Sequence, residues 1–284
     1  MWHSYCYYLH EFIEITKNTS DTMWGNQTMK FALKALSLAV VASASTFTFA
    51  DDEPALPFGF SFSGSAAVTT DYRFRGLTQT QNDPAVQAGF TLAHDSGLYL
   101  GLWGSNVDFG EGSPSLELDP SIGFATTLES FASKPVLDVG MVYYNYPSAD
   151  DLNWLEFYGK LTFASVFTEG DSLLTNVNYT NDYVAADTDS WNINAGYAIP
   201  FGSTGFGGVA NVGYTVVSDE DKYSFGDDDN YVDWKVGVTY AFQSIPGATA
   251  ELAAVGTNID TDNLDHVTAR GVETGAVFTL TKTF

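Results

Sequence analysis

The sequence predicts an all-β protein: a transmembrane, antiparallel, up-and-down β-barrel of about twelve strands, with ten to fourteen compatible with the pattern. Three observations lead to this fold class. Segments after residue 50 alternate apolar and polar side chains with a period of two, which is typical of strands. No stretch there holds about 18 consecutive apolar residues, as a membrane-spanning helix would. Short and long connections alternate along the chain, as they do in outer-membrane barrels.

The first 50 residues are set apart from the barrel. Residues 29–50 have the layout of a secretory signal peptide: two lysines, a short apolar run, and small residues that fit a cleavage after Ala50, with a cut after Ala44 as second choice. Residues 1–28 have no such composition. We interpret them as an extension that is not translated, with the start at Met29; a genuine long leader is the alternative.

The predicted barrel domain spans residues 51–284. In the whole chain 35 Asp plus Glu stand against 11 Lys plus Arg, and the formal net charge is −24. No basic cluster balances this charge, which argues against nucleic acid as a partner because phosphates are bound through Lys or Arg. The only cysteine, Cys6, lies outside the barrel domain, so we expect neither a disulfide nor a cysteine metal site there.

The alternation can be followed through twelve segments. Leu155, Phe157 and Leu161, for example, alternate with Glu156 and Lys160. Spanning strands need about 9–11 residues. The predicted strands cover residues 58–71, 85–93, 97–107, 115–128, 135–146, 153–167, 172–181, 190–200, 205–217, 231–243, 247–256 and 267–284.

The connections fall into two classes. Every second one is short, such as residues 94–97 and 168–171, whereas the others are mostly longer and acidic, including residues 181–189, 218–230 and 257–266. An even strand number places both termini on the short-turn side, which faces the periplasm in outer-membrane barrels. We therefore expect much of the acidity on extracellular loops.

A soluble β-sandwich or lipocalin-like barrel also alternates, but its apolar face points inward. Here the opposite face carries Ser, Thr, Asn, Gln, Gly and charged residues, and the chain has an export signal. The better interpretation is a barrel with an apolar outer face and a polar inner face around a water-filled lumen. It predicts an integral protein of a Gram-negative outer membrane, in contact with lipid and lipopolysaccharide.

The C-terminus carries the most specific local signal. Gly275, Phe278, Leu280 and the terminal Phe284 have the spacing by which the barrel-assembly machinery of the outer membrane recognises a last strand. An aromatic residue at the rim also suits the headgroup boundary. We expect this machinery as a partner during biogenesis.

Residues 69–80 (TTDYRFRGLTQT) resemble the N-terminal motif of the TorF family of porins, small bacterial outer-membrane barrels. Residues 85–90 (AVQAGF), 97–103 (GLYLGLW) and 143–147 (YYNYP) also match that family's pattern. The resemblance covers essentially the whole barrel domain. It implies an outer-membrane barrel of the porin type, and it transfers no catalytic or substrate-binding residue.

The alternation along each strand indicates which charged residues face the lumen. A charged residue on the lipid side is unfavourable, because Arg or Lys near the bilayer midplane costs roughly 2–4 kcal/mol there. The same phase places Tyr72 and Phe74 in the outer aromatic girdle. The basic residues either form a charged constriction that biases solute choice or neutralise neighbouring acids inside a plugged barrel, and both readings stay open. The pore-lining candidates are Arg73, Arg75, Glu117, Asp119, Asp138, Glu156, Lys160, Asp233, Lys235, Glu251 and Glu273.

We expect no enzyme activity, no cofactor and no resident metal. His94-Asp95-Ser96 resembles the His-x-Ser of outer-membrane phospholipases, but it lies in a predicted periplasmic turn and has ordinary turn composition. The acidic loop at residues 218–230 suits Ca²⁺, but it lacks the spaced ligands and central Gly of an EF-hand. A solvated loop, bridged by divalent cations to lipopolysaccharide, is the favoured alternative.

The expected function is passive diffusion of small hydrophilic solutes, ions included, through a porin-like lumen. The alternative is a non-conducting structural or adhesion barrel that acts through its acidic loops. A lumen of about twelve strands is narrow, since open porins have about 16–18. Trp103, Tyr144 and Tyr158 are side chains that could close it.

Overall fold

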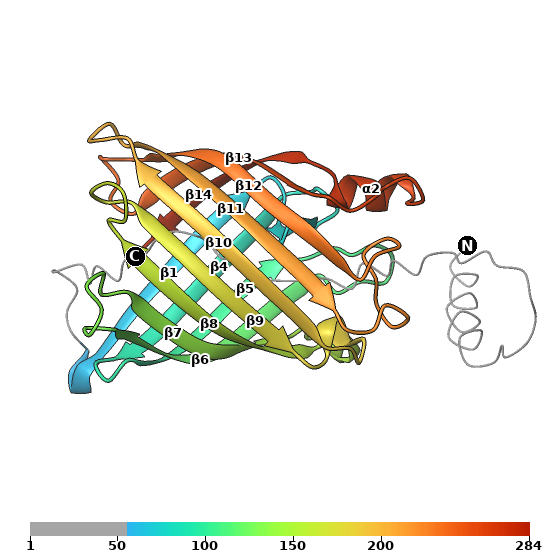
Figure 1. The fold of residues 1–284 in the computed structure, drawn as a ribbon, viewed down its shortest axis with the longest axis horizontal. Helices are drawn as coiled ribbons and strands as arrows, with labels where there is room; N and C mark the ends of the chain where they lie inside the picture. The colour runs from blue at the N-terminus through green and yellow to red at the C-terminus, as the bar shows by residue number, and fades with distance from the viewer. Residues whose placement is uncertain (1–55) are drawn as a thin grey trace, which may run out of the picture. The chain divides into compact units, whose positions relative to one another are not determined.

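The computed structural model describes residues 56–284; the predicted signal peptide and N-terminal extension lie outside these residues. Twelve strands close into one antiparallel barrel, in which sequence neighbours pair and the last strand pairs with the first (Figure 1). This confirms the predicted fold class. The barrel strands are β1 (Phe60–Thr69), β4 (Ala85–His94), β5 (Leu98–Asn106), β6 (Leu116–Thr127), β7 (Val136–Tyr144), β8 (Trp154–Ala164), β9 (Ser172–Thr180), β10 (Ser190–Pro200), β11 (Phe206–Val217), β12 (Asn230–Ala241), β13 (Ala248–Thr257) and β14 (Gly275–Thr283).

Short elements lie in the connections. They are η1 (Pro57–Gly59), the hairpin strands β2 (Arg73–Phe74) and β3 (Leu77–Thr78), η2 (Asp150–Leu152), η3 (Tyr183–Ala185) and α2 (His266–Val272). Among the described residues, no helix has the length and apolar character needed to cross a membrane.

Eleven of the twelve predicted strands begin and end within three residues of the observed bounds. The prediction for residues 267–284 is wrong at its start, because α2 occupies residues 266–272. Asp265 caps this helix: its side chain accepts hydrogen bonds from the backbone N–H groups of Val267 and Thr268, which satisfies donors that have no partner within the helix.

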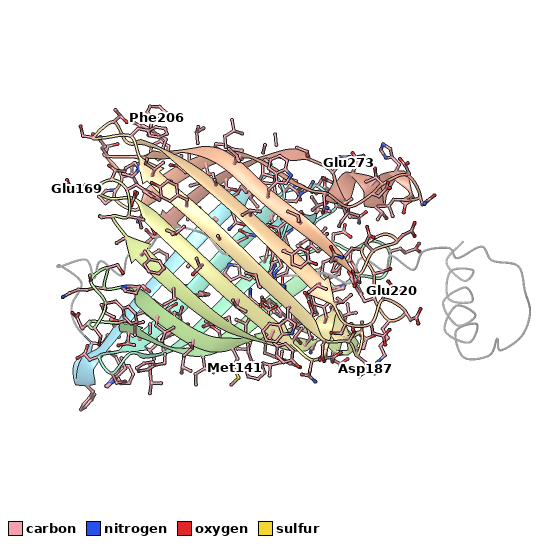
Figure 2. The ribbon with its side chains drawn as sticks, in the orientation of Figure 1. Met141, Glu169, Asp187, Phe206, Glu220 and Glu273 are labelled. Atoms are coloured by element: carbon pink, nitrogen blue, oxygen red, sulfur yellow. The ribbon has the colours of Figure 1, made fainter. Side chains whose placement is uncertain are left out.

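The barrel is apolar outside and polar inside. Phe62, Leu100 and Val236 are each at least half exposed on the outer face, whereas Asn192 and Thr215 on the inner face are almost fully buried. Figure 2 shows Met141 projecting from the outside of the wall. This is the inside-out arrangement of a barrel surrounded by lipid, and the opposite of a soluble sandwich.

The two ends of the barrel differ. At the end we call the turn end, five connections join the strands, and residues 95–97 form the shortest. The other six connections meet at the opposite end, called the loop end, where residues 70–84 and 258–274 are the longest. Figure 2 shows Glu169 at the turn end and Glu220 at the loop end.

Candidate functional site

The first long connection folds across the lumen at the loop end. Its strands β2 and β3 form a hairpin whose tip is Arg75-Gly76, with φ of 47° and 81°. Two successive positive φ values are the signature of a type I′ turn, which needs a residue such as Gly that tolerates this region. Arg75 at the tip contacts Glu156 on β8 and Tyr231 on β12, and the residue before the hairpin, Tyr72, contacts Glu117 on β6. The hairpin therefore lies across the barrel mouth.

This placement corrects one prediction. Tyr72 and Phe74 do not belong to an outer girdle, because each is only 1% exposed, inside the mouth. Strand β1 ends at Thr69, where the Thr69 hydroxyl donates to the carbonyl of Asp71 and the chain turns inward. The phase of β1 no longer applies beyond this point.

Arg75 at the hairpin tip pairs with a carboxylate of the wall. Its Nη2 lies 2.8 Å from each carboxylate oxygen of Glu156, and the side chains are 7% and 3% exposed. Tyr144 donates to the same carboxylate at 3.1 Å. The Arg75 guanidinium lies 4.6 Å from the centre of the Phe74 ring. The backbone carbonyl of Arg75 accepts a hydrogen bond from the Tyr231 hydroxyl. Two different strands thus hold the tip.

Arg73 has a different role from Arg75. Its Nε pairs with Asp71 at 2.5 Å, while Nη1 donates to the carbonyls of Gly76 and Gly271, and Nη2 donates to Asn82. These partners belong to the hairpin loop and to α2. With its donors engaged and its side chain 5% exposed, Arg73 fastens the hairpin to the last loop and does not face the lumen.

Aromatic side chains fill the mouth around the hairpin. The rings of Tyr144 and Trp154 stack at 4.1 Å between centroids, Trp154 meets Tyr183 at 5.7 Å, and Phe225 meets Tyr231 at 4.4 Å. None of these rings is more than 2% exposed. We call the following set the mouth cluster: Tyr72, Phe74, Tyr144, Trp154, Tyr183, Phe225 and Tyr231.

Of the three side chains expected to close the lumen, Tyr144 belongs to the mouth cluster. Trp103 lies against Tyr72 at 5.4 Å between ring centroids. Tyr158, farther along β8 from the mouth, makes a close hydroxyl contact with Tyr99.

Two carboxylates of β6 are buried beside the mouth cluster. Glu117 accepts from the hydroxyls of Tyr72 and Tyr146, at 3.3 and 3.1 Å, and is fully buried. Asp119, two residues farther along the same inner face, accepts from the backbone N–H of Asn145 and is 2% exposed. Neither takes part in an ion pair among the described residues. These two carboxylates of the barrel wall therefore have no basic side chain paired with them.

Several buried polar atoms of the mouth lack a hydrogen-bond partner among the described residues. They are Nη1 of Arg75, Oδ2 of Asp119, Oδ2 of Asp233, Nε1 of Trp154 and the hydroxyl of Tyr183. Asp233 lies beneath the hairpin tip, since a Cβ added to Gly76 would stand 3.0 Å from its Cβ. Such orphaned groups are rare in folded proteins and cost about 1–3 kcal/mol each.

The remaining basic candidates pair with acids on adjacent strands. Lys160 lies 3.7 Å from Asp138, and Lys235 lies 2.9 Å from Glu251. These four side chains are 20–24% exposed, against 3–7% for the pair at the hairpin tip. Each basic candidate thus has a carboxylate partner, as the neutralisation reading predicts. The lumen beyond the mouth is therefore less densely filled than the mouth itself.

Glu273 was predicted to line the pore, and its position contradicts this. It is the C-cap of α2, exposed in the connection to β14, and Figure 2 shows it at the loop end. The predicted strand that would have turned Glu273 inward does not begin until Gly275. Its carbonyl accepts a hydrogen bond from Arg73.

Three residues of the predicted assembly signal, Gly275, Phe278 and Leu280, lie on the closing strand β14, and Phe284 follows it directly. β14 pairs with β1 from Ser65↔Thr283 to Thr69↔Thr279. Phe278 and Leu280 are each 45% exposed on the outer face, and the Phe284 ring contacts Phe90.

Two further motifs have local explanations. His94 and Ser96 contact each other at 2.8 Å in the exposed turn between β4 and β5, as turn residues do. In the loop at residues 218–230, Lys222 pairs with Asp187 of a neighbouring loop, and this contact lowers the pKa of the Asp187 carboxyl. The described residues contain no group of three or more His, Cys, Asp or Glu arranged to hold a metal ion.

Residues 51–284 match the family described as "Bacterial protein of unknown function (Gcw_chp)". The chain belongs to this family. A comparison with curated proteins found no match. The resemblance to the TorF family stays a prediction, because the Gcw_chp description does not contain that name.

Solved structures similar to this Gcw_chp chain are distant in sequence. A NanC porin has 8% identity and a TM-score of 0.49, covering 79% of this chain and 99% of that one. A KdgM porin has 7% identity and a TM-score of 0.49, covering 78% and 99%. LpxR from Salmonella typhimurium has 11% identity and a TM-score of 0.46, again covering 78% and 99%.

Proposed function

We propose that the protein is an outer-membrane, porin-like channel through which small hydrophilic solutes, ions included, diffuse passively. One observation carries the proposal: the charged pairs inside the polar lumen are partly exposed, whereas the pair at the hairpin tip in the mouth is buried. Lys160 and Asp138 are about one-fifth exposed inside the barrel, whereas Arg75 and Glu156 at the mouth are almost completely buried. Solute choice would be made at this constriction, by size and charge.

The orientation follows from the same proposal. The loop end faces the outside of the cell, the turn end faces the periplasm, and the apolar outer face meets lipid. Export through the signal peptide and insertion by the barrel-assembly machinery precede this arrangement. The acidic loops then lie beside lipopolysaccharide, where divalent cations bridge the two anionic surfaces. No chemical reaction, cofactor or resident metal is required.

Single-channel recording in planar bilayers tests the function. We expect discrete conductance steps from the purified protein. In Arg75→Ala, the mouth loses a positive charge, so the reversal potential in a KCl gradient should shift towards greater cation selectivity. Lys134→Ala is the matched control, because it also removes one positive charge, but from an exposed pair in a turn-end connection. Unchanged selectivity in a conducting Arg75→Ala channel would reject the constriction at Arg75.

A second candidate function is a non-conducting structural or adhesion barrel that uses its acidic loops. The near-complete burial of the mouth cluster favours it, because a permanently closed mouth passes nothing. Absence of conductance steps at every salt concentration, for wild type and Arg75→Ala alike, would support this candidate and contradict the channel.

A further inference from the structure

We infer that Arg75 occupies the place of a solute, and that the mouth beneath the hairpin is a binding site for small organic cations with a guanidinium or primary ammonium group. The inference deepens the proposed channel function and rests on it. The hairpin would then be a tethered competitor that cationic solutes displace on entering the lumen.

The barrel wall supplies acid at the mouth, and the loop supplies the base. Glu117, Asp119, Glu156 and Asp233 come from β6, β8 and β12, and all are at most 6% exposed. Among the described residues, Arg75 is the only basic side chain that forms an ion pair with any of them. A buried carboxylate without a counter-charge is strongly unfavourable. When the hairpin leaves, Glu156 loses its counter-charge, and a free cation can take the place of Arg75.

The rings that stay with the wall suit the same ligand class. Tyr144 donates to the Glu156 carboxylate, Trp154 stacks on Tyr144, and the Tyr231 hydroxyl donates to the carbonyl at the hairpin tip. Aromatic faces attract guanidinium and ammonium groups, particularly where water is excluded. Carboxylates surrounded by rings are thus a cation-recognition arrangement.

Unpaired atoms show that Arg75 fits the site incompletely. Both hydrogen bonds to Glu156 come from Nη2, whereas the buried Nη1 has no partner among the described residues. Oδ2 of Asp233 is also buried without a partner. A free cation is not restrained by a loop, so it can pair with Glu156 and orient its own donors more completely than the tethered guanidinium does.

The hairpin is joined to the barrel wall at a fixed base and can move as a unit. β2 and β3 share only two residue pairs, Arg73↔Thr78 and Phe74↔Leu77. The ladder between β1 and β4 continues to Thr69↔Ala85, so the base of the loop is fixed, and release of residues 70–84 breaks the bonds from Arg73 to Gly271 and from Tyr231 to Arg75. Arg75 also has a positive φ, which is unfavourable for a residue other than Gly.

Chemical rescue tests the site independently of conductance. The full-length Arg75→Ala protein is heated in detergent with methylguanidinium, or with urea as a neutral ligand of similar shape. We expect methylguanidinium at several times its Kd to raise the Tm of Arg75→Ala by about 2–4 °C. Wild type, in which methylguanidinium must first displace Arg75, should respond less than Arg75→Ala, and Arg75→Ala/Glu156→Gln, which lacks the acid, should not respond. Arg75→Gln replaces Arg75→Ala if the latter does not fold.

An equal response of all variants, or no response of Arg75→Ala and Arg75→Gln, would overturn the inference. Uptake of agmatine into liposomes containing wild type then connects the site to transport, with an uncharged solute of similar size as reference. If no solute enters but the rescue succeeds, the channel function fails while the cation site stands. If solutes enter without preference for agmatine and the rescue fails, the channel stands and the cation site fails.

Discussion

Glu156→Gln removes the charge that holds the hairpin tip while keeping Arg75 and the size of the side chain. In the wild type, one guanidinium nitrogen lies 2.8 Å from both Glu156 oxygens, and both side chains are almost fully buried. Removing one partner of a buried ion pair costs about 3–5 kcal/mol. Because the Gln carbonyl can still accept one hydrogen bond, we expect the lower end, about 3 kcal/mol.

This energy acts on the equilibrium between the docked and released hairpin. A difference of about 3 kcal/mol corresponds to roughly a hundredfold increase of the released fraction. Trypsin measures that fraction, because it can cut after Arg75 only when the hairpin has left the mouth, and slow cleavage follows the population of the open form. Cleavage after Lys222, whose side chain is 41% exposed in another loop, is the internal reference.

Glu251→Gln is the matched control, because it breaks the more exposed Lys235–Glu251 pair at 2.9 Å. This pair joins two strands of the wall, and a partly solvated pair contributes about 0–1 kcal/mol, so cleavage after Arg75 should change less than about fivefold. The reasoning is refuted if Glu156→Gln leaves the cleavage ratio at the wild-type value, or if Glu251→Gln raises it equally.

Three further predictions concern the hairpin and the last loop. Gly76→Ala should release the hairpin, because the added Cβ would stand 2.5 Å from Cγ2 of Thr257. Gly112→Ala is the control, because Gly112 also has a positive φ, +80°, but no atom lies near its added Cβ. The ratio of trypsin cleavage after Arg75 to cleavage after Lys222 measures both effects. Arg73→Lys should speed hydrogen exchange in residues 266–272 and leave the barrel strands unchanged, because the ammonium cannot reproduce the donors that hold Gly271. In α2, hydrogen bonds from Thr268 lower the pKa of the capping Asp265. The cap stabilises α2 above about pH 3.9, and this stability is lost as the pH falls through the lowered pKa of Asp265. Amide hydrogen exchange in α2, corrected for the intrinsic rate, should therefore accelerate in that range. Asp265→Ala should abolish this pH dependence.

The strands were predictable because their cause is local. A wall with lipid outside and water inside needs a side-chain period of two, and that period is visible in any single strand. Turn residues such as those at 94–97 mark where one strand ends. The same reasoning gave the wrong start for β14. Val267, Ala269 and Gly271 alternate with polar residues as they would in a strand, but the cap at Asp265 begins a helix there.

The hairpin at residues 70–84 escaped for a different reason. Strand phase assigns a side only while the chain stays in the sheet, and β1 ends at Thr69. Local signals do indicate a hairpin here, because the apolar residues Phe74 and Leu77 flank the turn pair Arg75-Gly76. Those signals do not say whether the hairpin projects into solvent or enters the barrel.

By itself, then, the sequence determined the barrel, its inside and outside, and which charged residues of the strands face the lumen, since each of these follows from a period along one strand. Only the tertiary structure decided which charges meet. Lys160 faces Asp138 because strand register sets them opposite each other. Arg75 reaches Glu156, 81 residues away in the chain, because barrel closure brings the first loop over β8. Contacts between distant segments depend on closure and packing, which no local pattern encodes.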